Sequence, residues 1–262
     1  MKLPFTRGLW MRYPVGSVEH KVFHGIYPYP HYAYGVYWAA FNARQLGIER
    51  ISAIEFGVAG GRGLVALERA SAEIERALGV GIDVVGFDSG TGMPRPIDYR
   101  DLPHVWRQGF FPMNEAELRS RLERATLVLG DVGTTVAEWV AAPHSPVGFV
   151  SFDLDYYSST KAAFRIFESS AVGYLPRVYC YFDDVASNNL SLVNEYVGEL
   201  LAILEYNDEH AHRKLTKIEQ LREARPRWEH WQDRMFAHHD FEHPLYTMQV
   251  VPAIGTNVAL PL

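Results

Sequence analysis

Apolar and polar positions follow two different periods on either side of a glycine-rich turn. Residues 51–56 (ISAIEF) form a short apolar run, as in a buried strand, and the positions after Gly63 then take helical spacing. The stretch ISAIEFGVAGGRGL therefore predicts a strand, a turn and the start of a helix. Its glycines can take positive φ, and the first N–H groups of the helix can bind an anion or carboxylate. A plain tight turn is the alternative.

Similar patterns predict alternating strands and helices along the rest of the chain. Apolar runs predict strands at residues 82–87, 125–129, 149–152 and 178–182. Helices are predicted at residues 32–46, 64–78, 115–124, where Asn114 is the N-cap, and 160–167. Further along, we expect a helix with an apolar stripe from Leu190 to Leu204, an exposed mixed-charge helix at 214–227, and antiparallel strands at 245–251 and 256–260.

Composition narrows the class of protein. A chain of 262 residues with 48% hydrophobic residues can bury one large core. The net charge of −6 argues against a nucleic-acid partner, and the one cysteine, Cys180, excludes an internal disulfide. We find no signal-peptide pattern and no apolar run of about 18 residues, so a cytoplasmic protein without a membrane partner is expected.

Two segments lie outside this regular pattern. Residues 1–49 are rich in tyrosine and tryptophan and are expected either to pack at the edge of the core or to form an N-terminal cap over a ligand. The long loop at 90–113 contains Trp106, Phe110 and Phe111, and loops of that length are commonly lids or binding loops. The C-terminal histidines are expected to be solvated or structural, because their spacing matches no zinc motif.

Two acidic residues follow strands after the glycine turn. Asp88 ends the second strand, where a carboxylate often holds the hydroxyl groups of a ribose. Asp131 and Val132 follow the third strand, where an adenine ring can rest. For both aspartates the alternative is a turn or a cap that a short acidic side chain stabilises.

Four carboxylates form the clearest candidate site. Asp153 and Asp155 follow one buried strand, and Asp183 and Asp184 follow the next. If these strands are parallel neighbours, the four side chains meet at one edge, where their repulsion raises the pKa values. A hard cation such as Mg²⁺ would relieve that repulsion. Separate roles as helix N-caps are the alternative.

The motifs IEFGVAGGRG, GFDSGTGMP, LVLGDVGTT, SFDLDYYSST and YFDDV, in this order, resemble the macrocin O-methyltransferase-like (TylF-type) family. Its members are class I S-adenosylmethionine-dependent enzymes, several of which methylate sugar hydroxyls of antibiotics with Mg²⁺. The resemblance covers residues 50–185. It implies a methionine site, a ribose site at Asp88, an adenine site at Asp131, a Mg²⁺ site and Asp155 as the general base. The methionine site would comprise Glu55, Gly57, Gly60 and Gly61, and the Mg²⁺ ligands would be Asp153, Asp183 and Asp184.

We therefore expect an α/β fold, specifically a Rossmann-like class I three-layer sandwich. A mostly parallel seven-stranded sheet with an antiparallel C-terminal strand would occupy residues 50–262, after a cap at 1–49. The expected function is Mg²⁺-assisted O-methylation of a small hydroxylated metabolite, with a homodimer as the family's habit. The alternatives are a metal-dependent glycosyltransferase, in which Asp153-Leu154-Asp155 is a D-x-D motif, and a non-catalytic member of the fold.

Overall fold

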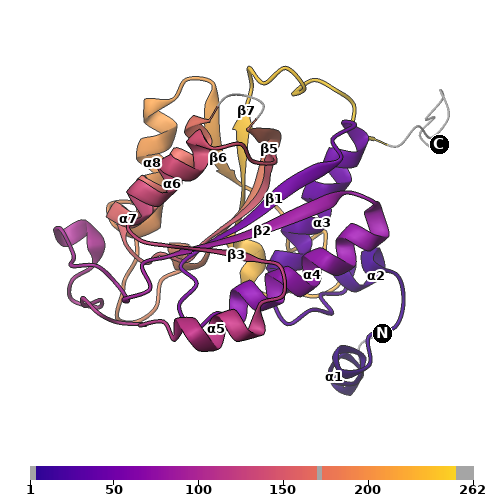
Figure 1. Cartoon of the computed structure of the whole chain (residues 1–262), viewed down its shortest axis with the longest axis horizontal. Helices are drawn as coiled ribbons and strands as arrows, with labels where there is room; N and C mark the ends of the chain where they lie inside the picture. Colours follow the sequence, from indigo (N-terminus) through magenta and orange to yellow (C-terminus); the bar gives the residue numbers. More distant parts are fainter. Residues whose placement is uncertain (1–3, 170–172, 252–262) are drawn as a thin grey trace.

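Seven strands in the described part of the chain form one sheet in the order β3-β2-β1-β4-β5-β7-β6. The computed structural model describes residues 4–169 and 173–251 (Figure 1). β7 pairs antiparallel with both of its neighbours, and the other pairings are parallel, so one strand runs against the rest. The strands are β1 (Arg50–Phe56), β2 (Gly81–Asp88), β3 (Thr126–Leu129), β4 (Val147–Phe152), β5 (Tyr174–Phe182), β6 (Arg213–Lys217) and β7 (Met235–Asp240).

Three α-helices precede the first strand, and the others lie between strands. The α-helices are α1 (Pro4–Arg12), α2 (Val18–Phe23), α3 (Pro30–Gln45), α4 (Arg62–Leu78), α5 (Glu115–Arg121), α6 (Val132–Ala141), α7 (Tyr157–Ala163) and α8 (Gly198–Glu209). Short 3-10 helices occur at η1 (Tyr99–Asp101), η2 (Phe164–Glu168), η3 (Asp183–Val185) and η4 (His230–Arg234). The predicted cap of α5 is confirmed, because the Asn114 side chain accepts a hydrogen bond from the Glu117 N–H. No helix in the described ranges is long and apolar enough to cross a membrane.

The helices cover both faces of the sheet, so the predicted three-layer sandwich is confirmed (Figure 1). Side chains alternate along each strand, and in β1 Ile51 and Ala53 therefore pack with α3 and α4 on one face. Ile54 and Phe56 pack with α6, α7 and α8 on the other face. The central strands are buried on both faces, which explains why they are continuous apolar runs in the sequence.

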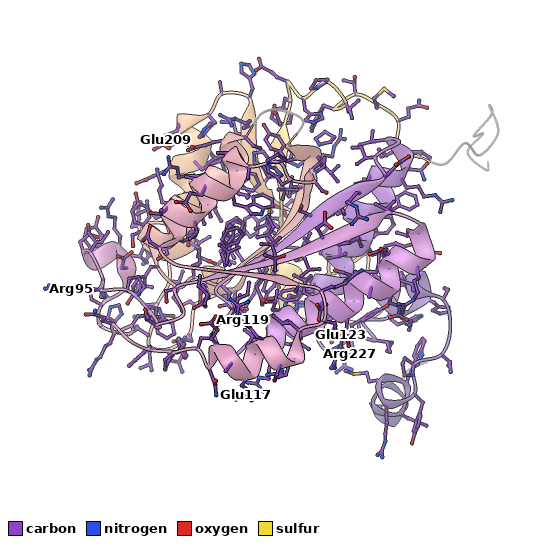
Figure 2. The ribbon with its side chains drawn as sticks, in the orientation of Figure 1. Arg95, Glu117, Arg119, Glu123, Glu209 and Arg227 are labelled. Carbon is purple, nitrogen blue, oxygen red and sulfur yellow. The ribbon has the colours of Figure 1, made fainter. Side chains whose placement is uncertain are left out.

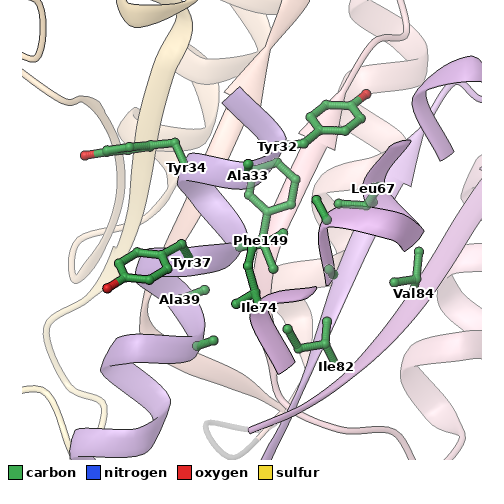
Figure 3. Close-up of a cluster of buried hydrophobic side chains, with 14 of the residues drawn as sticks. Tyr32, Ala33, Tyr34, Tyr37, Ala39, Leu67, Ile74, Ile82, Val84 and Phe149 are labelled. Carbon is green, nitrogen blue, oxygen red and sulfur yellow. The ribbon is translucent and has the colours of Figure 1, made fainter. Parts of the chain in front are cut away.

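The aromatic residues of α3 belong to the core. Tyr32 and Tyr37 are buried in the cluster between α3, α4 and the sheet (Figure 3). Gly35 permits this close packing, since a Cβ there would lie 2.2 Å from the Phe149 ring of β4. These α3 rings therefore pack in the core, which was the first of the two alternatives. Whether residues 1–49 form a separate unit stays a prediction.

The C-terminal third differs from the sequence predictions. The helix predicted at 214–227 is wrong, because residues 213–217 form β6 and turns follow. The strand predicted at 245–251 is also wrong, because that segment forms turns, and 256–260 lies outside the described residues. α8 begins only at Gly198, and its buried face is Ala202, Ile203 and Tyr206 instead of the leucine stripe. β6 is short and carries exposed lysine at the sheet edge, so its local pattern resembles a solvated helix.

Candidate functional site

Four phenylalanines lie in register across the centre of the sheet, one residue before its carboxyl edge. Phe56 of β1 pairs with Phe87 of β2 and with Phe152 of β4, which in turn pairs with Phe182 of β5. Their ring centroids are 5.0, 5.4 and 4.6 Å apart in the order 87–56–152–182. This register places the next residue of every strand at one edge. Those residues are Asp88, Gly57, Asp153 and Asp183.

The turn after β1 requires glycine at position 57. Gly57 has φ of +85°, and a Cβ there would lie 1.8 Å from the backbone oxygen of Asp153. The end of β4 therefore passes too close for any side chain. Two residues later, the Ala59 N–H donates to the Asp88 carboxylate over 2.8 Å. The glycine turn is thus joined to both neighbouring strands.

A cavity of about 730 Å³ opens at this edge of the sheet. Its walls come from the glycine turn, the ends of β2 to β5, and the long loop between β2 and α5. It brings together most of the residues that the sequence singled out. The lining includes Gly57, Asp88, Asp131, Val132, Asp153, Asp155, Asp183 and Asp184. Glu55, Gly60 and Gly61 are not part of the lining.

Glu55 lies behind the glycine turn, on the α3 side of the sheet. Its Oε1 accepts a 2.6 Å hydrogen bond from the Tyr32 hydroxyl, which also accepts from Ser151. A Cβ on Gly63 would lie 2.0 Å from the same oxygen. Burial raises the pKa of Glu55 to about 8, and the charge of Asp88 adds to the rise. Its Oε2 is buried without a hydrogen-bond partner, as a site for an ammonium group would require.

Asp88 and Asp131 both line the cavity and both stabilise local structure. Asp88 accepts from the N–H groups of Ala59 and Gly90 over 2.8 and 2.7 Å. Asp131 is the N-cap of α6 and accepts from the Thr134 N–H over 3.0 Å. Both aspartates therefore stabilise a turn or a helix cap, as the alternative interpretation predicted. The ribose and adenine roles stay predictions, since a carboxylate can accept further hydrogen bonds while it caps.

The two acidic pairs meet as predicted, because β4 and β5 are parallel neighbours. Asp155 has φ of +58°, a conformation that few non-glycine residues adopt, and its N–H donates to the Asp184 carboxylate over 3.0 Å. Burial raises the pKa values of Asp153, Asp155 and Asp184, and the neighbouring carboxylates raise them further. Backbone strain and perturbed acids at one place are typical of functional sites.

Sequence reasoning missed the partners of these acids. Asp183 Oδ1 accepts 2.6 Å hydrogen bonds from both the Arg234 guanidinium and the Tyr181 hydroxyl. Behind Asp184, the buried Glu199 accepts from its backbone N–H. Arg234 lies at the end of η4, far along the chain, and no local pattern links it to the acidic pairs.

The four carboxylates of the acidic pairs are the type of ligand that a hard cation binds, but their side chains are not positioned around one common point. Carboxylate oxygens are the ligands that Mg²⁺ prefers. Asp153 lines the cavity, and one oxygen of Asp183 is engaged by Arg234. In the described part of the chain, no three His, Cys, Asp or Glu side chains are positioned to hold one metal ion. A bound ion would require these side chains to turn.

A buried aspartate that no sequence pattern singles out anchors the long loop beside the cavity. The buried Asp101 carboxylate accepts from both the N–H and the hydroxyl of Ser158, at the start of α7, over 2.9 Å each. It also accepts from the Ile97 N–H. This contact fixes the middle of the loop, and Trp106, Phe110 and Phe111 of the same loop line the cavity.

Two solved methyltransferases resemble this chain. CalS11, a calicheamicin methyltransferase, aligns with a TM-score of 0.53 and 21% identity over 90% of this chain and 90% of its own. The O-methyltransferase NovP aligns with a TM-score of 0.52 and 16% identity over 80% of this chain and 79% of its own. No protein-family model matches the sequence. No curated protein matches it. At this identity the likeness shows the Rossmann-like class I methyltransferase fold.

Proposed function

We propose that this chain is an S-adenosylmethionine-dependent methyltransferase that acts on a hydroxyl oxygen of a small metabolite, such as a sugar or natural product. One observation carries the proposal. A single cavity, at the carboxyl edge of a methyltransferase fold, is lined by the glycine turn, two aspartates suited to a nucleoside and four further carboxylates. Ligands of open α/β sheets bind at this edge.

The cofactor would lie along β1 to β3. Gly57 leaves room for close approach, Asp88 would accept from the ribose hydroxyls, and Asp131 with Val132 would contact the adenine. The unpartnered Oε2 of Glu55 suits the ammonium of the methionine end. When bound, S-adenosylmethionine supplies an electrophilic methyl group on a positively charged sulfur.

Asp155 is the proposed general base. It lines the cavity next to Asp153 and Asp184, and its raised pKa gives it a higher proton affinity than an ordinary aspartate. It would lose its own proton when positive charge enters the cavity, and could then accept the proton of the acceptor hydroxyl. Its strained backbone is held in place by the hydrogen bond from its N–H to the Asp184 carboxylate. Such fixed positioning is a large part of catalysis by group transfer.

Mg²⁺ assistance is a second part of the proposal, with Asp153, Asp183 and Asp184 as ligands. Mg²⁺, when bound, would stabilise the negative charge that develops on the acceptor oxygen. The three residues line the cavity beside Asp155. Their crowding, which raises the pKa values of Asp153 and Asp184, supports a site for positive charge.

Calorimetric titration separates these parts. We expect S-adenosylmethionine and Mg²⁺ to bind the wild-type protein separately, and we expect Mg²⁺ binding to be lost in Asp183→Asn.

A methyl-transfer assay tests the general base. In Asp155→Asn we expect cofactor affinity to persist while kcat falls by about 100- to 10,000-fold, the usual contribution of a general base. Cofactor binding without Mg²⁺ binding would remove the metal from the proposal. Absence of cofactor binding would refute the whole proposal, and binding of a nucleotide sugar instead would support a glycosyltransferase.

A further inference from the structure

The ionisable side chains of the cavity wall are all acidic. Each ionisable side chain among the described lining residues is an aspartate, and neither lysine, arginine nor histidine contributes to that lining. The six aspartates are Asp88, Asp131, Asp153, Asp155, Asp183 and Asp184. A ligand that carries a phosphate would therefore meet acidic side chains in this wall and no cationic side chain to pair with.

The nearby arginines are engaged or lie outside the cavity. Arg234 is paired with Asp183, and Arg100 is paired with Asp98 and lies over the Tyr157 ring. Arg95 and Arg107 are exposed on the long loop, next to lining residues in the sequence. Figure 2 shows Arg95 at the outer edge of the molecule, directed away from it. Neither Arg95 nor Arg107 is part of the cavity lining.

A second part of the cavity wall is aromatic. Trp106, Phe110 and Phe111 line the cavity from the long loop, and the Phe111 ring centroid lies about 6 Å from those of the other two. Phe110 and Phe111 are 40% and 51% exposed, which is unusual for two adjacent phenylalanines. A flat apolar ligand would cover these rings and remove them from water.

From these two walls we infer the class of the methyl acceptor: an uncharged or cationic alcohol that carries an aromatic or other flat apolar group, and not a phosphorylated sugar. This inference rests on the proposed function of the cavity. The aspartate wall accepts the positively charged cofactor and the hydroxyl that is methylated. The aromatic wall holds the apolar group of the acceptor, and the cavity of about 730 Å³ is within the size range of small-molecule sites.

Matched ligands test the inference. Phenyl β-D-glucoside, its 6-phosphate and methyl β-D-glucoside would be titrated into the full chain saturated with S-adenosylhomocysteine, with Mg²⁺ and with EDTA. We expect the phenyl glucoside to bind at least about tenfold more tightly than either of the others. Phe111→Ala should weaken it by about tenfold, whereas Ile97→Ala, an exposed residue of the same loop outside the lining, should not.

Two results would overturn the inference. One is that the phenyl glucoside does not bind or binds no better than the methyl glucoside. The other is that the 6-phosphate binds as tightly as the phenyl glucoside or more tightly. Loss of that phosphate binding in the double variant Arg95→Gln/Arg107→Gln would then locate an anion site on the loop. Binding of S-adenosylhomocysteine in the same experiment keeps the two proposals distinguishable, because its failure refutes the proposed function itself.

Discussion

At the scale of the residue, burial raises the proton affinity of Glu55 in the folded protein. Its pKa rises from the ordinary 4.5 to about 8, chiefly because the side chain is buried. The folded state therefore binds more protons than the unfolded chain between these two pH values. By linkage, the stability contributed by this group is fully present below pH 4.5 and is lost as the pH rises towards 8.

Glu55→Gln should remove this dependence. The amide can still accept the Tyr32 hydrogen bond but does not ionise. We expect the free energy of unfolding of the variant to rise relative to wild type as the pH rises from 4.5 to 8. The gain is expected to approach about 1.4 kcal/mol for each unit of pKa shift. Urea unfolding at several pH values measures the difference, and two parallel pH profiles would contradict the assignment.

Gly57 offers a second test at this scale. Gly57→Ala would combine a left-handed backbone with a clash against the Asp153 oxygen, whereas Gly47→Ala has a similar positive φ but no atom within 4 Å. The control therefore has only the conformational cost, about 1–2 kcal/mol. We expect Gly57→Ala to lose more stability than that, and to lose affinity for S-adenosylmethionine. Equal losses of stability for Gly57→Ala and Gly47→Ala in thermal melts would show that the turn can shift enough to relieve the clash with Asp153.

At the scale of the element, the phenylalanine row sets the register of four strands. The paired positions of Phe56, Phe87, Phe152 and Phe182 fix which residue of each strand reaches the carboxyl edge. A shift of one residue would move every side chain of a strand to the opposite face. The packing of these rings thus decides that aspartates, and not their neighbours, line the cavity.

Phe152→Ala should reveal the strength of this packing. Phe152 is fully buried between the rings of Phe56 and Phe182, and truncation of a buried phenylalanine costs about 3–5 kcal/mol. Phe111→Ala provides the control, because that side chain is half exposed and its loss should change stability by about 0.5 kcal/mol or less. Chemical unfolding measures both. Similar effects in the two variants would contradict the role of the row.

At the scale of the whole molecule, the cavity joins parts of the chain that are far apart in sequence. Its lining extends from Gly57 to Asp184. A ligand that binds there binds only the folded state and therefore stabilises the entire fold.

His238, one of the C-terminal histidines, is structural. It is buried with its ring centroid 4.0 Å from that of Phe167, and its ring is hydrogen-bonded to the Tyr206 hydroxyl.

S-adenosylhomocysteine should therefore raise the melting temperature. At a concentration of 100 times its Kd, the stabilisation is expected to be about 2.7 kcal/mol. Asp88→Asn should reduce this shift, since it removes the carboxylate proposed for the ribose. Asp83→Asn should retain it, because this half-buried aspartate of the same strand pairs with Arg50 and does not line the cavity. An unchanged shift in Asp88→Asn would exclude Asp88 from the cofactor site.

Much of this arrangement could be predicted from the sequence, because it depends on local periods and on chain order. The change from strand to helical spacing across the glycine turn identifies β1 and α4, both of which are confirmed. Aspartates that directly follow buried strands must lie at one edge once those strands are parallel, so the meeting of Asp153 with Asp183 follows from their positions.

Only the tertiary structure decided which distant groups meet. Arg234 pairs with Asp183, Tyr32 with Glu55 and Asp101 with Ser158 across long stretches of chain. None of these pairs has a local signal, since each depends on how helices and loops pack. The same reason explains β6. Its polar sequence predicts an exposed helix, but β7 supplies the backbone partners that make it a strand. A local pattern predicts a helix or strand correctly only where the apolar side chains of that segment themselves decide which of its faces is buried.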